Sequence, residues 1–204
     1  MTTKFIHKLE QVIAQKQRYI ALMITPQIIK MPLPMKRHDD PFLPFSKSII
    51  RATQAITPVY VFNLAAYLRI GAAGAIALER TISYAVADSV LILHGPFAGA
   101  GYAEISDENA FGVDAVTLYE LKNVAAYLQR ADRGAFVIDK AKQNIDPYPD
   151  GVGSLDFDAQ ALRIRGSDGV TITLELFGED AIYVSAAEDY AEQTRQFLEA
   201  QRND

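Results

Sequence analysis

The stretch VLILHGPFAGAG, residues 90–101, ends in the way that the active-site strands of α/β proteins end. A buried apolar strand runs into glycines, and catalytic side chains commonly lie where such strands end. Here, however, His94 is the only ionisable residue of the stretch. It would serve as a general base, as a metal ligand, or as a neutral histidine that is hydrogen-bonded at a strand end.

Other polar residues also follow buried strands and would ring the same end of a parallel sheet: Thr25, Asn63, Tyr119, Glu120 and Asp139. Such a ring suits a small neutral or cationic ligand, or it is a set of satisfied strand-end groups. The other two histidines lie far from His94 in the sequence, so we expect no metal site. GPFAGAG lacks the lysine and the hydroxyl residue of a phosphate-binding loop, and no cofactor is predicted.

Composition sets limits on the class of protein. The chain has 204 residues, half of them hydrophobic, a net charge of −5 and no cysteine. An acidic chain does not suit a nucleic-acid groove, and without cysteine there are no disulfides or thiolate sites. No apolar run approaches the roughly twenty residues that span a bilayer, and the charged N-terminal segment lacks a signal-peptide core. We therefore expect one soluble cytoplasmic domain over residues 1–204.

A regular alternation of strands and helices occupies the first two thirds of the chain. Strands are predicted at 19–25, 58–62, 89–93, 114–119 and 135–139, and helices at 3–17, 46–55, 72–85, 103–109 and 120–129. This rhythm is typical of a parallel sheet with right-handed crossovers, in a doubly wound sheet or a (β/α)8 barrel.

The pattern changes near the C-terminus. Residues 155–177 alternate polar and apolar side chains around a Ser-Asp-Gly turn, which predicts an antiparallel hairpin. A final strand is predicted at 180–185 and an amphipathic helix at 187–201.

Five short motifs give the chain a family resemblance: Ser48–Thr53, Tyr60–Asn63, Ala66–Tyr67, Gly71–Gly74 and Leu78–Ile82. In this order they resemble the orotidine 5′-phosphate decarboxylases, specifically the longer bacterial subfamily. DAVTLYE and IYVSAAEDYAEQTRQFLEA fit a further strand and the last strand and helix of that family. The resemblance covers residues 3–140 and 180–201 and implies a (β/α)8 barrel.

The catalytic positions implied by the resemblance have lost their charges. The family uses carboxylates and lysines at the strand ends, because loss of carbon dioxide leaves a carbanion that a lysine stabilises and protonates. The corresponding vestigial positions, including that of the phosphate-binding arginine, are Thr25, Val61, His94, Pro96, Gly99 and Ala186. The carboxylates of Glu188 and Asp189 would also repel a phosphate at the start of the last helix.

The length implies a shortened barrel. A full barrel takes about 250 residues, and the hairpin at 155–177 lies where the family has its sixth and seventh βα units. We expect a degenerate barrel whose uncovered surface is buried against another chain. Phe62 and Phe97 replace polar strand-end residues, so they would plug the old pocket or form an apolar contact patch.

Three functions follow as hypotheses. The first is a non-catalytic pseudoenzyme that binds proteins, as a homodimer or as a structural or accessory subunit of a hetero-oligomeric complex. The second is a small-molecule-binding regulatory module that uses the vestigial pocket, and the third is an enzyme of new chemistry around His94 and Asp139. Candidate ligand or partner contacts are Asn63, His94, Phe62, Phe97, Tyr119 and Asp139.

Overall fold

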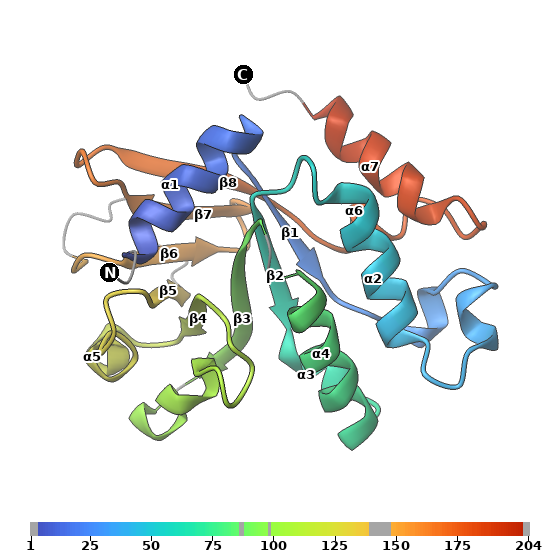
Figure 1. Cartoon of the computed structure of the whole chain (residues 1–204), viewed down its shortest axis with the longest axis horizontal. Helices are drawn as coiled ribbons and strands as arrows, with labels where there is room; N and C mark the ends of the chain where they lie inside the picture. Colours follow the sequence, from blue (N-terminus) through green and yellow to red (C-terminus); the bar gives the residue numbers. More distant parts are fainter. Residues whose placement is uncertain (1–3, 86–87, 98, 139–147, 202–204) are drawn as a thin grey trace.

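The computed structural model describes residues 4–85, 88–97, 99–138 and 148–201. Within them, eight strands close into a barrel in chain order (Figure 1). The strands are β1 (Ile20–Ile24), β2 (Val59–Asn63), β3 (Val90–Phe97), β4 (Ala115–Leu118), β5 (Gly134–Ile138), β6 (Val152–Asp156), β7 (Ala161–Arg165) and β8 (Thr171–Phe177). The predicted α/β barrel is confirmed.

One strand runs against the others. Strands β1 to β6 pair in parallel, and β8 pairs in parallel with β1, whereas β7 is antiparallel to both β6 and β8. The turn between β7 and β8 contains Ser167–Gly169, and Gly169 has a φ of 84°, a conformation that favours glycine. The β6–β7 loop therefore lies at the C-terminal mouth of the barrel and the β7–β8 turn at the opposite end.

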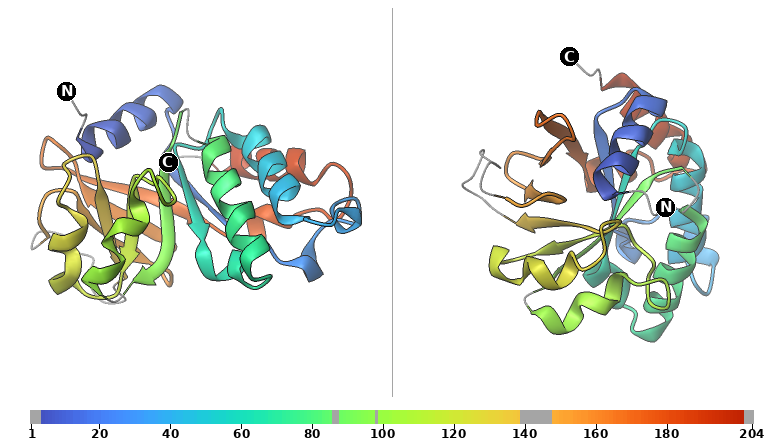
Figure 2. Two further views of the ribbon diagram at one scale, coloured as in Figure 1. Left: turned by 60° about the horizontal axis from the view of Figure 1, so that its bottom comes forward. Right: turned by 60° about the vertical axis from the view of Figure 1, so that its left-hand side comes forward.

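Helices cover the outside of the barrel on the side of β1 to β3 (Figures 1 and 2). Helix α2 packs between α4 and α7. The helices are α1 (Phe5–Lys16), α2 (Phe42–Thr53), α3 (Leu64–Leu68), α4 (Ala72–Ala85), α5 (Val124–Tyr127), α6 (Glu179–Ile182) and α7 (Tyr190–Ala200). No helix in the described part of the chain combines the length and the apolar character needed to cross a bilayer.

Several predicted elements need correction. Residues 180–185 are not a strand but contain most of α6, because Thr171–Phe177 already pairs with β1 and closes the barrel. The helix predicted at 103–109 is a 3-10 helix at Ala100–Ser106, and the one at 120–129 reduces to a 3-10 turn and α5. The third strand, predicted at 89–93, continues to Phe97.

The hydrophobic core has two parts, divided by the alternation of side chains along each strand. Leu22, Tyr60 and Phe62 point outward and pack with residues of α2, α3 and α4. Met23 and Val61 belong to the other cluster, which fills the barrel and includes apolar residues of α1. The barrel interior is therefore a packed apolar core and not a channel.

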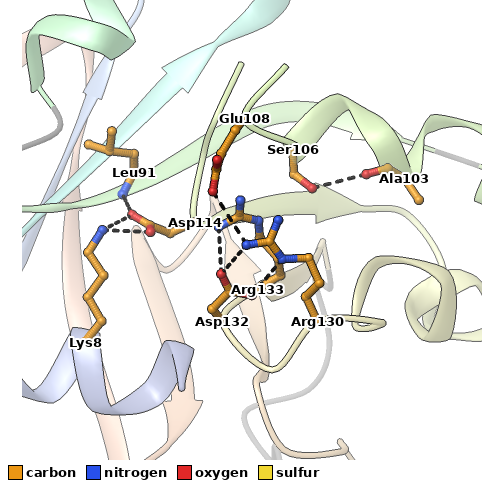
Figure 3. A network of polar contacts seen from close by, with 9 residues as sticks. All are labelled: Lys8, Leu91, Ala103, Ser106, Glu108, Asp114, Arg130, Asp132 and Arg133. Carbon is orange, nitrogen blue, oxygen red and sulfur yellow. Dashed lines mark hydrogen bonds and ion pairs between the residues drawn. The ribbon is translucent and has the colours of Figure 1, made fainter. Parts of the chain in front are cut away.

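Helix α1 closes the N-terminal end of the barrel (Figure 1). Lys16 donates hydrogen bonds to Thr57 O and Ser89 Oγ, both at 2.8 Å, just before β2 and β3. Lys8 contacts both carboxylate oxygens of Asp114 at 2.7 Å, just before β4 (Figure 3). These polar contacts hold the helix over the strand starts.

Asp114 is expected to contribute strongly to stability. It is 8% exposed, pairs with Lys8 and accepts the Leu91 N–H at 2.9 Å. Asp114→Ala leaves that N–H and the partly buried ammonium without their acceptor, so we expect the free energy of unfolding to fall by about 2 kcal/mol. Urea unfolding measures this change, with Asp158→Ala as the control because Asp158 is an exposed loop residue. Equal losses of unfolding free energy in the two variants would contradict the prediction.

Candidate functional site

The C-terminal ends of β1 and β2 carry neutral side chains. Thr25 follows β1 and is 6% exposed, and Val61 in β2 is 0% exposed and faces the barrel interior. Asn63 ends β2, where its Oδ1 accepts the Ala66 N–H at 3.1 Å and caps α3. The amide of Asn63 therefore has a structural partner, as expected for a helix N-cap.

His94 lies at the mouth, one pleat beyond the interior residue Ile92 in β3. Its Nδ1 is 3.0 Å from Thr117 Oγ1, which also accepts the Gly95 N–H at 3.2 Å. The imidazole and the hydroxyl share one hydrogen bond, and the tautomer of the ring decides which of the two donates. The Phe157 ring packs edge-on against the imidazole at 5.2 Å between centroids, so the loop between β6 and β7 covers the histidine.

The burial of His94 keeps it neutral. Desolvation lowers its pKa to about 4. A ring with this pKa carries no charge at pH 7, and its hydrogen-bond partner is a hydroxyl group, not a carboxylate. Asp139, the carboxylate predicted to act with His94, lies outside the described residues.

The low pKa of His94 predicts a loss of stability in mild acid. The unfolded chain binds a proton near pH 6.5 and the folded chain only near pH 4, so the unfolded state gains protons first as the pH falls. We expect the free energy of unfolding to drop between these values by at most about 3 kcal/mol. Urea unfolding from pH 7 to pH 4.5 measures the drop, and a His94→Gln variant with an identical profile would contradict it.

The two strand-end phenylalanines lie away from the barrel interior. Phe62 is 0% exposed and follows Val61, so it points outward into the layer beneath the helices. Phe97 belongs to the same outer core, and its ring is 5.8 Å from that of Tyr102. Phe62 and Phe97 therefore neither plug the barrel nor form an exposed patch; both are core residues.

The remaining predicted positions are spread around the mouth. Gly99 O accepts the Tyr127 hydroxyl at 2.6 Å, Pro96 lies within β3, and Glu120 pairs with Lys122 at 2.6 Å. Tyr119 is 57% exposed. Among the described residues, no three potential metal ligands come together.

A carboxylate, that of Asp189, lies at the start of α7, where it contacts side chains and not the helix amides. Asp189 accepts the Ser185 hydroxyl at 2.9 Å and the Gln193 amide at 3.0 Å, while Ala186 is exposed. An arginine at Ala186 would be needed to attract a phosphate, and Asp189 repels one.

The sequence did not identify Thr117 or Phe157 as neighbours of His94. A threonine inside the buried strand AVTL is a detectable signal, because a buried hydroxyl needs a partner. Phe157 gives no such signal, because its approach depends on the reversal of the chain at β7.

An α/β chain whose eight strands close into a barrel, with helices outside and polar residues at the strand ends, is a TIM-barrel protein. Comparison with known proteins defines the family more closely. No family model matches the chain. The orotidine 5′-phosphate decarboxylase of Thermomicrobium roseum is 32% identical over 142 residues, which are 66% of this chain and 50% of the relative. The orotidine 5′-phosphate decarboxylase of Herpetosiphon aurantiacus is 25% identical over 142 residues, which are 66% of this chain and 53% of the relative.

Solved structures of orotidine-monophosphate decarboxylases are also similar to this chain. A putative orotidine-monophosphate decarboxylase of Toxoplasma gondii matches with a TM-score of 0.59 and 26% identity, over 69% of this chain and 50% of that one. The decarboxylase of Leishmania donovani matches in fold, with a TM-score of 0.67 at 14% identity, over 97% and 98% of the two chains. The chain belongs to the orotidine 5′-phosphate decarboxylase family. It spans about half the length of the curated relatives named above.

Proposed function

We propose that this chain is a non-catalytic member of its family. The observation that supports this most strongly is the burial of Val61, which the family resemblance aligns with the lysine of a Tyr-Lys-Pro-Asn strand. Its side chain is 0% exposed within the apolar interior of the barrel. Thr25 and the neutral His94 stand at the neighbouring strand ends. These three positions supply no fixed charge to stabilise a carbanion.

The test of this proposal is a decarboxylase assay. Purified chain is incubated with orotidine 5′-monophosphate, and the loss of substrate is followed by its ultraviolet absorbance, with the Thermomicrobium roseum enzyme as the positive control. We expect no conversion above the buffer blank. The assay is repeated over a range of chain concentrations, so that an active site shared between two copies would also be detected. Turnover that rises with chain concentration would contradict the proposal.

For its cellular role, we propose that the chain binds another protein, either a second copy or a larger partner. Three apolar side chains support this: Ile28, Ile29 and Leu33, in the loop after β1, are 48%, 83% and 69% exposed. Neighbouring exposed apolar groups are typical of interaction surfaces.

The loop is held in place, so it would present these side chains in a fixed arrangement. The Gln27 N–H donates to the Tyr183 hydroxyl at 2.6 Å, and that hydroxyl donates to Thr25 O at 3.1 Å. The Gln27 side chain and Lys30 both contact the carboxylate of Glu179 in α6. A pre-formed surface loses less conformational entropy on binding than a disordered one does.

The role is tested by the native mass of the protein, purified gently from its own cells, with mass spectrometry of whatever co-elutes. We expect a stoichiometric dimer or larger complex that dissociates in an Ile29→Asp, Leu33→Asp double variant. The control is Val170→Asp, since Val170 is 63% exposed at the other end of the barrel. A lone monomer, or a complex that the double variant leaves intact, would contradict this interface.

A ligand module that uses the vestigial pocket has less support. Phe157 packs on His94, and the interior below is filled by side chains such as Val61 and Phe136, both 0% exposed. A regulatory ligand at the mouth would have to displace Phe157.

A further inference from the structure

A cavity of about 340 Å³ lies at the N-terminal end of the barrel, opposite to the mouth that the family uses. Four segments form it: the start of α1, the residues before β5, the turn before β6 and the turn between β7 and β8. Figure 1 shows the start of α1 beside β5 and β6. The volume of the cavity is at the lower end of the range for small-molecule sites, about 300–1,000 Å³.

The charged side chains that line this cavity are mostly basic. They are Lys4, Arg130, Arg133 and Arg165, with Asp150 as the one lining carboxylate. The whole chain has a net charge of −5, so this concentration of positive charge is a local feature. A cavity in which one sign of charge predominates concentrates ions of the opposite sign.

Arg133 is buried without full satisfaction of its hydrogen-bond donors. Its side chain is 9% exposed, and its Nε has no hydrogen-bond partner. Its Nη1 is 3.6 Å from Asp132, which is already engaged by Arg130 at 2.6 and 3.0 Å (Figure 3). Two guanidinium groups thus share the carboxylate of Asp132, and Arg130 also lies 3.7 Å from the carboxylate of Glu108. A buried charged donor without an acceptor is costly, and such a group often marks a site that a ligand completes.

The first turn of α1 adds to the positive potential. Phe5 and His7 line the cavity from this turn, which contains no acidic residue. The N-terminus of a helix favours anions because its dipole and its amide groups point toward them. The Phe5 N–H already donates to Ala131 O at 3.0 Å, so a ligand would meet the amides that follow it. Phe5, Ile6 and Leu128 supply an apolar wall that suits the carbon skeleton of a ligand.

We propose that this cavity binds the phosphate group of a small phosphorylated metabolite. Arg133 and the start of α1 hold the phosphate, with Lys4 at the entrance, since Lys4 is exposed. A guanidinium group binds carboxylate and phosphate oxygens alike, but a phosphate ester carries up to two negative charges and more acceptor oxygens, so several basic side chains attract it more strongly than a single carboxylate. The inference goes beyond the proposed protein-binding role and does not depend on it.

The test uses isothermal titration calorimetry of the full chain with inorganic phosphate and with glycerol 3-phosphate. We expect saturable binding of both, tighter for the ester because its carbon chain contacts the apolar wall. Arg133→Gln should weaken binding about tenfold, as expected for the loss of a charged hydrogen bond. Lys4→Gln should weaken it less. The matched control is Lys122→Gln, because that lysine is 74% exposed and pairs with Glu120 at the opposite end of the barrel.

Four outcomes would overturn the proposal. The first is the absence of saturable binding, and the second is an affinity that Arg133→Gln and Lys4→Gln leave unchanged. Should Arg133→Gln fail to fold, the exposed Lys4 still provides the test. The third is tighter binding of a phosphoserine peptide than of glycerol 3-phosphate, which would assign the surface to a protein ligand. Equal competition by chloride at the same ionic strength would likewise show non-specific screening.

Discussion

Replacing Val61 with lysine, the residue that the family resemblance implies at this position, is expected to lower the free energy of unfolding by about 4 kcal/mol. The side chain of Val61 is 0% exposed, and it packs in the interior cluster with Met23 and Ile92. Among the described residues, an ammonium group there would meet no counter-ion at the neighbouring strand ends, which carry Thr25 and the neutral His94. The restored lysine would therefore destabilise the barrel and not reactivate it.

Urea unfolding at pH 7 measures this effect, with Val170→Lys as the matched control. Val170 is also a valine but is 63% exposed, so its replacement should change stability by less than about 0.5 kcal/mol. Near-equal effects of the two substitutions would mean that the interior around Val61 is open to water. Decarboxylation of orotidine 5′-monophosphate by the Val61→Lys variant would contradict the inference that a lysine at this position cannot restore activity.

Replacing Gly74 with alanine is expected to lower the free energy of unfolding by about 3 kcal/mol. A Cβ at Gly74, in the first turn of α4, would lie 1.8 Å from Tyr67 O. That carbonyl cannot easily move, because the Tyr67 side chain is fully buried and its hydroxyl is 2.7 Å from Ser46 Oγ. The Tyr67 ring also packs edge-on against Phe42, at 5.9 Å between centroids.

Gly101→Ala is the control for this substitution, because a Cβ at Gly101 meets nothing within 4 Å. Thermal unfolding of the two variants should show a clearly lower midpoint for Gly74→Ala alone. Equal midpoints would mean that α3 and α4 can separate at no cost. The result also bears on the Gly71–Gly74 motif. The close approach of Tyr67 O would explain why the second position of the motif is a glycine.

The first half of the barrel could be predicted because its signals are local. Each strand from β1 to β5 is an apolar run bounded by turn residues, and the 48–82 motifs identify the family. Helix α4 has the bounds predicted for it, Ala72–Ala85. Periodicity and turn chemistry depend on neighbouring residues alone, so they are readable from one sequence.

The rest depends on contacts between distant segments. IYVS has the composition of a strand, but the place beside β1 is already taken by Thr171–Phe177. Likewise, Phe157 reaches His94 only because the chain turns back at β7. Propensity cannot anticipate which segment will occupy a pairing edge.

The closed ring of strands has a consequence for how the chain folds. Closure pairs Ile20 with Glu175, so two segments near opposite ends of the sequence must meet. Contacts of such long separation carry a large loop entropy and are slow to form. We therefore expect the strands from β1 to β6 to assemble first, leaving two open edges. The β7–β8 hairpin, which can form by itself through local contacts, would then join both edges in a single late step.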